Sequence, residues 1–321
     1  MLEVIEPGLL TTVQDLGRPE AVNLGAPVGG ACDNWSLRTA NALVGNEAGA
    51  AALELTLAGP TLAIRADCRV GLAGADLAAR LVPDEISFEP GTSRLLRAGQ
   101  TLAFDVAGDR TGVRAYLALA GGLDVPLVLG SRSTCLVGGF GGLGGRALIA
   151  GDVVSGGASA TGGRSLTWPA DGPRPPIEAS RRPLRLLPGP HAAHFEADAL
   201  ERLTTAPYRI SPRADRQGLF LDGERIFVGQ GGGPLLSHGV VWGAIQLPPD
   251  GRPICLLADH QTIGGYPVLA VVISADLPLL GQLGPADPVS FELVDQDTAL
   301  AALRDQARAF AAARALLVAE A

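Results

Sequence analysis

The amino-acid sequence predicts a mainly β protein with a few helices, built as two related β-barrel lobes. Short apolar runs recur along the chain and are separated by Gly, Pro and Asp, at spacings typical of β-sandwiches and β-barrels. The 43 glycines and 24 prolines supply the turns that such a fold needs. With 321 residues, the chain is long enough for two domains of ordinary size.

Segments of similar sequence occur in the same order in the two halves of the chain. The pairs are TVQDLGRP (Thr12–Pro19) with PRADRQG (Pro212–Gly218), GAPVGGA (Gly25–Ala31) with HGVVWGA (His238–Ala244), and LRAGQTLAF (Leu96–Phe104) with LGPADPVSF (Leu283–Phe291). Each match is weak by itself. Their common order predicts a duplicated β-barrel module.

Six apolar runs are the clearest strands, because each is bounded by turn residues and rich in Leu, Val, Ile or aromatic side chains. They are Thr61–Ala66, Thr101–Val106, Arg114–Ala120, Pro253–Ala258, Val268–Ser274 and Pro288–Val294.

Helices are few. Residues 33–46 fit one, since apolar side chains share a face, Asp33 can cap the start and Gly45 can end it. Residues 191–203 are a second candidate. The tail, residues 296–321, is a third, with Asp297 as cap and an apolar face made of Leu300, Leu303, Ala307 and Phe310. We expect this tail to pack on the outside of the second lobe.

These elements predict an N-terminal lobe over residues 1–165 and a C-terminal lobe over residues 183–295, followed by the helix of residues 296–321. The segment of residues 155–182 is rich in Gly, Ser and Pro, which is typical of a linker or a long surface loop.

Composition excludes several classes of function. The formal net charge of -8 argues against a nucleic-acid partner, which would need a basic face. No run of about 18 apolar residues occurs, so no membrane span is expected, and the acidic N-terminal residues do not resemble a signal peptide. We therefore expect a cytoplasmic protein.

All 25 Lys and Arg residues are arginine. Without a lysine, this chain alone can form neither a Walker-type phosphate site nor a Schiff base.

Cysteine and histidine spacing favours no metal site. The four cysteines, Cys32, Cys68, Cys135 and Cys255, are far apart, and we expect buried free thiols. His191 and His194 could share a helical face as metal ligands, but without a third ligand in the sequence a solvated helix start is the favoured interpretation.

A glycine-rich stretch and an arginine-rich stretch each allow two interpretations. Gly139, Gly141 and Gly144 match a dinucleotide-binding pattern, yet the following residues read as strand and turn, so a glycine loop approached closely by another backbone is favoured. Arg213 and Arg216, on either side of Asp215, form either a self-satisfied turn or a fork for a carboxylate or phosphate.

The stretch LLADHQTIGGYP (Leu256–Pro267) is the strongest candidate site. A tight turn would need only its glycines, yet Asp259, His260, Gln261 and Thr262 directly follow an apolar strand. Gln246 joins them if two strands form a hairpin through the sequence PPDG. Polar groups that converge at the ends of buried strands are typical of binding sites. We expect them to face a wet pocket.

Several long motifs resemble the allophanate hydrolase subunit 2 family, also described as KipA-like or biotin-dependent carboxyltransferase. They are TTVQDLGR, NALVGNEAGAAALELTL, GGFGG, GRALIAGD, PGPH, DRQG, HGVVWGAIQLPPDGRPICLLADHQTIGGYP and DPVSFE, which together extend over residues 1–295. The resemblance implies two cyclophilin-like β-barrel lobes.

The family resemblance also implies an activity, with alternatives that the sequence leaves open. A free-standing chain of this size is similar to the C subunit of an ATP-dependent 5-oxoprolinase, an amide-bond hydrolase that opens 5-oxo-L-proline to L-glutamate together with subunits A and B. The second of these, which is KipI-like, would be the most direct partner, and the complex would use ATP. The alternatives are a carboxyltransferase that takes a carboxyl group from biotin on a separate carrier, and a KipA-like regulator of a KipI-like partner.

Residue roles follow from the motifs and the resemblance together. We expect Asp259, His260 and Gln261 to be catalytic, with no metal. We expect the substrate to be bound by Arg216, Asp215, Gln246, Thr262, Gly264, Gly265, Tyr266, His191, Asp15 and Arg18. Gly265 would serve a positive-φ turn or a close ligand approach. Gln217 and Trp242 depart from the methionine and proline usual in the family.

Overall fold

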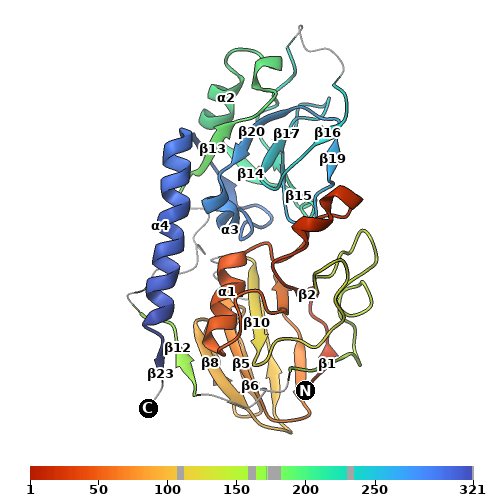
Figure 1. The fold of residues 1–321 in the computed structure, drawn as a ribbon, viewed down its shortest axis with the longest axis vertical. Coiled ribbons are helices and arrows are strands. Elements are labelled where there is room, and N and C mark those ends of the chain that lie inside the picture. The colour runs from red at the N-terminus through yellow and green to blue at the C-terminus, as the bar shows by residue number, and fades with distance from the viewer. Residues whose placement is uncertain (107–111, 158–163, 171, 173–181, 230–234, 320–321) are drawn as a thin grey trace. The chain divides into compact units, whose positions relative to one another are not determined.

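The structure is a computed structural model that describes residues 1–106, 112–157, 164–170, 172, 182–229 and 235–319. The chain forms two compact units, shown with their elements in Figure 1. Unit 1 comprises residues 1–20, 29–177 and 308–321, and unit 2 comprises residues 21–28 and 178–307. No helix among the described residues is long and apolar enough to cross a membrane.

Unit 1 contains two antiparallel sheets. The first has the order β11-β1-β4-β9-β6-β7, and the second has the order β2-β3-β10-β5-β8-β12-β23. Their strands are β1 (Leu2–Glu6), β2 (Leu10–Gln14), β3 (Ala52–Thr56), β4 (Thr61–Ile64), β5 (Cys68–Gly74), β6 (Arg80–Val82), β7 (Ile86–Ser87), β8 (Thr92–Leu96), β9 (Thr101–Ala103), β10 (Arg114–Leu119), β11 (Val153–Val154), β12 (Leu166–Thr167) and β23 (Val318–Ala319).

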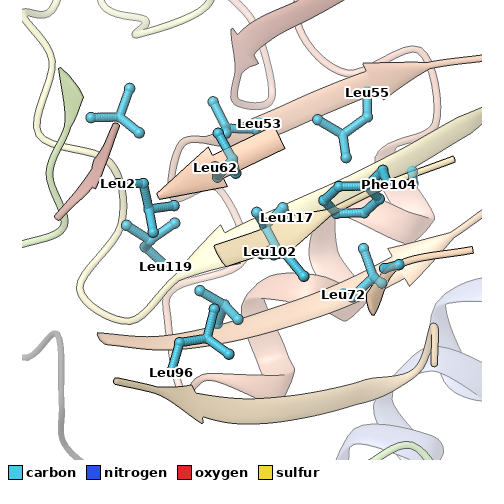
Figure 2. Close-up of a cluster of buried hydrophobic side chains, with 14 of the residues drawn as sticks. Leu2, Leu53, Leu55, Leu62, Leu72, Leu96, Leu102, Phe104, Leu117 and Leu119 are labelled. Carbon is cyan, nitrogen blue, oxygen red and sulfur yellow. The ribbon is translucent and has the colours of Figure 1, made fainter. Parts of the chain in front are cut away.

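The core of unit 1 lies between these two sheets. Leu2 and Leu62 come from the first sheet, and Leu53, Leu72 and Leu117 come from the second. Figure 2 shows these side chains converging on one another. In both sheets, alternate residues of the strands point into this aliphatic core. The predicted β lobe is therefore packed around it.

Helix α1 (Asn34–Leu43) covers the outer face of the second sheet. Asp33 caps it, because the Asp33 Oδ1 accepts the Ser36 backbone N–H at 2.9 Å, and the left-handed φ of +74° at Gly45 follows its end. The predicted helix over residues 33–46 is confirmed. The short 3₁₀ helix η1 (Pro19–Leu24) precedes it in the chain.

Unit 2 is built on one sheet of eight strands with the order β21-β14-β15-β18-β17-β20-β13-β22. Strands β21 (Pro288–Val289) and β22 (Phe291–Leu293) lie at opposite ends of this order, although only Ser290 separates them in sequence. The sheet must therefore curl almost onto itself, as a β-barrel does. Its other strands are β13 (Leu184–Pro188), β14 (Tyr208–Ile210), β15 (Gly218–Asp222), β17 (Ala244–Gln246), β18 (Ile254–Leu256) and β20 (Val268–Val272).

Short elements complete unit 2. A two-stranded ribbon pairs β16 (His238–Gly239) with β19 (Ile263–Gly264). The helices are η3 (Ala192–His194), α2 (Ala199–Thr205), η4 (Ser274–Asp276) and α3 (Leu277–Leu280). The single helix predicted over residues 191–203 is wrong, because Phe195 is extended and bridges to Val228, which breaks the helix into η3 and α2.

Helix α4 (Gln296–Ala315) is the predicted tail helix, with two differences. Its cap is Asp295, whose Oδ1 accepts the Thr298 N–H at 2.8 Å, and not Asp297. Its buried side chains are Phe310 and Ala313, which belong to unit 1. The expectation that the whole tail packs on the second lobe is therefore wrong for its last turns.

Two turns provide structural evidence for the duplication. At the turn that starts at Arg97, the Gln100 N–H donates to the Arg97 carbonyl, and the Gln100 side chain accepts the Arg97 N–H. At the turn that starts at Gly284, Asp287 makes the same two bonds with Gly284. The third residue of each turn has a positive φ. These turns fall in the sequence pair of residues 96–104 and 283–291.

Both turns also join equivalent strands. Ile64, at the end of β4, exchanges backbone hydrogen bonds with Gly99 and Gln100, and Ile210, at the end of β14, does so with Ala286 and Asp287. The pairs β4–β9 and β14–β21 are both antiparallel. A related unit thus occurs in each half of the chain, and the mainly β fold class predicted from the sequence is confirmed.

The glycine-rich stretch in unit 1 is a loop and opens no helix. Gly141 has a φ of +74°, and an added Cβ would lie 2.1 Å from the Ser133 carbonyl oxygen. The interpretation as a closely approached glycine loop is confirmed, although no strand forms directly after Arg146. Of the predicted linker, residues 158–163, 171 and 173–181 lie outside the described residues, and residues 166–167 form β12.

Candidate functional site

The hairpin predicted through the sequence PPDG exists and positions the candidate site in unit 2. Strands β17 and β18 pair antiparallel, with Gln246 opposite Ile254, and the Gly251 N–H donates to the Pro248 carbonyl at the turn. Strand β18 then ends at Leu256. The backbone that follows carries the predicted polar residues.

Asp259 and Arg216 form a buried ion pair. The Arg216 Nε donates to the Asp259 Oδ2 at 2.9 Å, and its Nη2 donates to the Oδ1 at 3.1 Å. The two side chains are only 2% and 1% exposed. The Asp259 N–H also donates to the Arg216 carbonyl. The pair therefore ties the end of β18 to the start of β15, and the expectation that Asp259 faces a wet pocket is wrong.

Asp215 and Gln217 flank Arg216 and are both exposed. The Asp215 Oδ1 accepts the Gln217 N–H at 2.7 Å and the Gly218 N–H at 3.2 Å, which fixes the turn that leads into β15. Asp215 therefore shapes the loop that delivers Arg216 to Asp259.

Two glutamines form the polar centre of the site. Gln246 is buried on β17, Gln261 is exposed, and the Gln261 Nε2 donates to the Gln246 Oε1 at 3.0 Å. Among the described residues, the buried Gln246 Nε2 has no acceptor. An unsatisfied buried amide donor costs free energy, so this atom is suited to a carbonyl or carboxylate oxygen of a ligand.

Gly264 is the glycine that the glutamine pair needs. A Cβ added to Gly264 would lie 2.7 Å from the Gln246 Nε2 and 3.3 Å from the Gln261 Nε2. Gly265 has no positive φ, and the nearest atom to an added Cβ, the Ser237 Oγ, is 4.0 Å away. The expected need for glycine at position 265 is therefore not explained by backbone conformation or by a close neighbour within the chain.

His260 is buried and directly precedes Gln261 in the chain. Its Nδ1–H donates to the Gln261 carbonyl at 2.6 Å, so a neutral ring keeps its basic lone pair on Nε2. Burial lowers the pKa of His260, and the hydrogen bond to Gln261 and the nearby Asp259 oppose this only in part. A neutral imidazole with a free Nε2 is a suitable general base.

Three histidines come together beside the ribbon of β16 and β19. The His191 ring lies 4.4 Å from the His238 ring and 5.5 Å from the His194 ring, measured between centroids. The His191 Nδ1 accepts the Val268 N–H at 3.2 Å. Burial, then the charges of His238 and His194, lower the pKa of His191. In the described parts of the chain, no His, Cys, Asp or Glu group is arranged to hold a metal ion.

Sequence reasoning missed His238. It stands opposite Gly264 in the ribbon, and its only signal was its position at the head of the repeated segment HGVVWGA. Thr262 is half-buried, and its carbonyl accepts the Val240 N–H, which closes the other end of the ribbon. Trp242 is half-buried next to this segment.

Two pockets share Tyr266 as a lining residue, and this residue is 45% exposed. The first has a volume of about 520 Å³ and is lined by His194, Phe227, Val228, Leu235, Leu247, Pro248, Pro249, Gly265, Tyr266 and Pro267. The second has a volume of about 510 Å³ and is lined by Arg213, Phe220, Pro248, Pro249, Asp250, Arg252, Ile254 and Tyr266. Tyr266 is thus a wall of both pockets.

Asp15 and Arg18 belong to unit 1 and have partners there. The Asp15 carboxylate accepts the Ser131 Oγ–H at 2.6 Å and the Arg132 N–H at 2.6 Å. Arg18 is buried, donates to the Ser133 carbonyl and lies over the Phe140 ring at 5.0 Å. Asp15 therefore holds the segment of residues 131–133, and Arg18 links this segment to Phe140 of the glycine-rich loop.

Comparison with known proteins adds a family context to this geometry. A family model described as the carboxyltransferase domain, subdomains A and B, matches residues 24–293. The chain is 40% identical to the C subunit of the 5-oxoprolinase of Escherichia coli over 310 residues, which cover 97% of this chain and 96% of that protein. It is 33% identical to the urea amidolyase of Lachancea kluyveri over 338 residues, which cover 94% of this chain but 18% of that protein.

Solved structures show the same fold within longer chains. The urea amidolyase of K. lactis matches with a TM-score of 0.84 and 28% identity, over 96% of this chain and 20% of that one. A second solved structure, 40% identical with a TM-score of 0.79, is covered to 55% of its length.

Proposed function

Because this chain belongs to the carboxyltransferase family of subdomains A and B, we propose that it is the C subunit of an ATP-dependent 5-oxoprolinase. The complex, completed by subunits A and B, opens 5-oxo-L-proline to L-glutamate. One observation carries this proposal: the 40% identity to the C subunit of a 5-oxoprolinase covers 97% of this chain and 96% of that protein. The match to urea amidolyase covers only a small part of that longer protein.

The chemistry that a lactam demands fits the glutamine pair. Ring opening adds water across a stable amide bond, and the complex couples this step to the hydrolysis of ATP to ADP and phosphate. Negative charge develops on the amide oxygen as the carbonyl is attacked. The Gln246 Nε2 and the Gln261 amide are donors suited to stabilise such charge, and at the buried Gln246 Nε2 water competes little.

The remaining residues of the candidate site have two roles, which are proton transfer and positioning. His260 accepts a proton at Nε2, because its Nδ1–H is already bonded to the Gln261 carbonyl. Asp259 acts as a positioning residue that anchors Arg216 and the start of the DHQT segment. Gly264 leaves space for the two amide groups.

The second candidate function is carboxyl transfer from biotin, held on a separate carrier, to urea or a similar amide. The family description and the urea amidolyase matches favour it. The exposed ring of Tyr266 between two pockets would then serve as a flat wall for the ureido ring. The same amide donors would polarise the ureido carbonyl.

We further infer that the chain works in a complex. Subunits A and B are the proposed partners, and the second of these, the KipI-like one, is the most direct. A complex that consumes ATP fits the cytoplasm.

Reconstitution with alternative partners tests the function. The purified chain is mixed with subunits A and B, and glutamate and ADP are measured with 5-oxo-L-proline and ATP. We expect both products from the mixture and neither from the chain alone. In parallel, the chain is mixed with a biotin carboxylase and a biotinylated carrier, with urea as acceptor. Urea carboxylation without 5-oxoproline turnover would replace the first function by the second.

A further inference from the structure

The second pocket beside Tyr266, here called the hairpin pocket, has the composition of an anion site. It lies at the turn of the β17–β18 hairpin and has flat apolar walls of Phe220, Tyr266 and two prolines. Three of its lining residues are charged: Arg213, Asp250 and Arg252. Flat walls with a few charged groups suit a small ring that carries a charge.

Arg213 is oriented without an acidic partner. Its guanidinium lies 5.0 Å from the centroid of the Phe220 ring. Among the described residues, no carboxylate forms an ion pair with it. Stacking on an aromatic face fixes the plane of a guanidinium and leaves the N–H groups of its edge free to donate. Arg216, three residues later, is instead committed to Asp259.

The other charges of the pocket are occupied. The Arg252 Nη1 lies 3.5 Å from the Asp222 Oδ1, and the Asp250 Oδ1 accepts the Arg252 backbone N–H at 3.2 Å. Arg213 is therefore the cation of this lining that has no ion-pair partner among the described residues, in a chain of net charge -8. A monoanion is enough to neutralise the Arg213 guanidinium, whereas Asp250 repels the doubly charged form of phosphate more strongly than a monoanion.

The hairpin pocket and the glutamine pair share one face of the unit 2 sheet. Phe220 pairs with Ile254, and Ile254 pairs with Gln246, so these side chains form a row across three adjacent strands. Strands lie about 4.8 Å apart, which places Phe220 and Gln246 about 10 Å from each other. Two hydrogen bonds of about 2.9 Å with a five-membered ring between them span a length of the same order as this separation of the two backbones.

We propose that Arg213 is a specificity-determining residue that binds the carboxylate of a small cyclic monocarboxylic acid in the hairpin pocket. The amide of that ligand then points along the row toward Gln246. This inference rests on the proposed function, because it identifies Arg213 as the anchor for the carboxylate of 5-oxo-L-proline. Bidentate guanidinium–carboxylate pairing supplies the geometric selectivity.

Calorimetric titration of the full chain tests this anchor with three probes: 5-oxo-L-proline, 2-pyrrolidone and inorganic phosphate. 2-Pyrrolidone is the same lactam without the carboxylate. We expect 5-oxo-L-proline to bind about tenfold more tightly than 2-pyrrolidone, and Arg213→Gln to abolish this preference. The control is Arg209→Gln, which removes the same charge from an exposed arginine of unit 2 that donates to the Ala286 carbonyl outside the pocket.

Three results would overturn the anchor: no binding of 5-oxo-L-proline to the wild-type chain, equal affinity in Arg213→Gln, or tighter binding of phosphate. The proposed function is judged separately, by turnover in the mixture with subunits A and B. Turnover with an unchanged KM in Arg213→Gln rejects the anchor and retains the function. Arg213-dependent binding in a mixture that forms no glutamate rejects the function and retains the anchor.

Discussion

Asp259 is held by Arg216 in a pair of which neither side chain has appreciable access to water. Removing one partner leaves the other charge buried and uncompensated, which is far more costly than the pair's own net contribution. The DHQT segment therefore depends on this pair for its position. A loss of activity on changing Asp259 has to be separated from a loss of fold.

We predict that Asp259→Ala lowers the free energy of unfolding by about 3–5 kcal/mol. The double variant Asp259→Leu, Arg216→Met should lose less, because no charge remains buried. Urea denaturation of the wild type and the variants measures both values. A change within about 0.5 kcal/mol for Asp259→Ala, the range of surface substitutions, would mean that the pair is not buried in solution.

The buried His260 and the half-buried His191 predict how stability depends on pH. Burial lowers the pKa of His260 and of His191, so the unfolded chain binds protons more readily than the folded one. Their stabilising contribution is complete above the unfolded value of about 6.5 and is lost as the pH falls toward the lowered folded values.

Thermal melting between about pH 5 and 7.5 tests this linkage, because carboxylates with ordinary values near 4 titrate below that window. We expect the melting temperature to fall as the pH is lowered through 6.5, and His260→Gln to reduce the slope. A melting temperature that is constant or rises on acidification contradicts the burial of these rings.

At the scale of residues, the sequence revealed what is local and missed what is not. Gln246 was placed beside Gln261 because the PPDG turn predicts their hairpin. The partner of Asp259 is 43 positions away in sequence, and no local pattern reveals that Arg216 reaches it. The neighbours of His238 and Arg213 are determined only when the chain packs in three dimensions, because His238 contacts His191 and Arg213 contacts Phe220.

Among the elements, the ribbon of β16 and β19 shapes the candidate site. It places Gly264 so close to both glutamine amides that a side chain cannot fit without moving them. Its neighbour Gly265 lines the first pocket and has space around it. The two glycines therefore offer a matched pair of substitutions.

We predict that Gly264→Ala reduces turnover in the reconstituted complex by at least about tenfold, because displaced amides stabilise the developing charge less well. Gly265→Ala should retain activity close to that of the wild type. Steady-state rates and melting temperatures of both variants make the comparison. Equal activity of the two variants would show that the glutamine pair does not take part.

Helix α4 supplies the second prediction at this scale. Phe310 is buried in unit 1, with its ring 5.2 Å from the Trp35 ring and 5.5 Å from the Trp168 ring. Phe310→Ala should cost about 3–5 kcal/mol, whereas Leu303→Ala, at a side chain that is 41% exposed, should cost little. Denaturant titration measures both. Similar costs at the two positions would contradict the packing of this helix.

Sequence patterns predicted the helix ends that are marked by nearby capping residues. They did not predict features that depend on contacts with distant residues. Asp33 and Gly45 mark the ends of α1 through their own chemistry. The buried face of α4 could not be assigned, because Leu300 and Leu303 are as apolar as Phe310, and only contact with two distant tryptophans decides which is buried. The break after His194 depends on the bridge from Phe195 to Val228.

At the scale of the molecule, the repeated sequence segments were the informative signal. The turns at residues 97–100 and 284–287 share their hydrogen bonds, although few of their side chains are the same. A duplicated fold could therefore be predicted from the order of weak matches. The boundary of the two units could not, because α4 contributes residues to both.

The most direct measurement is the rate of glutamate formation from 5-oxo-L-proline and ATP by subunits A and B with this chain, compared with the same mixture containing Gln246→Leu. Leucine is close in size to glutamine and removes only the buried amide. We predict glutamate formation with the wild-type chain, a rate about 100-fold lower with Gln246→Leu, and an unchanged melting temperature. A mixture that forms no glutamate with the wild-type chain, or forms it equally fast with a folded Gln246→Leu variant, would contradict the account.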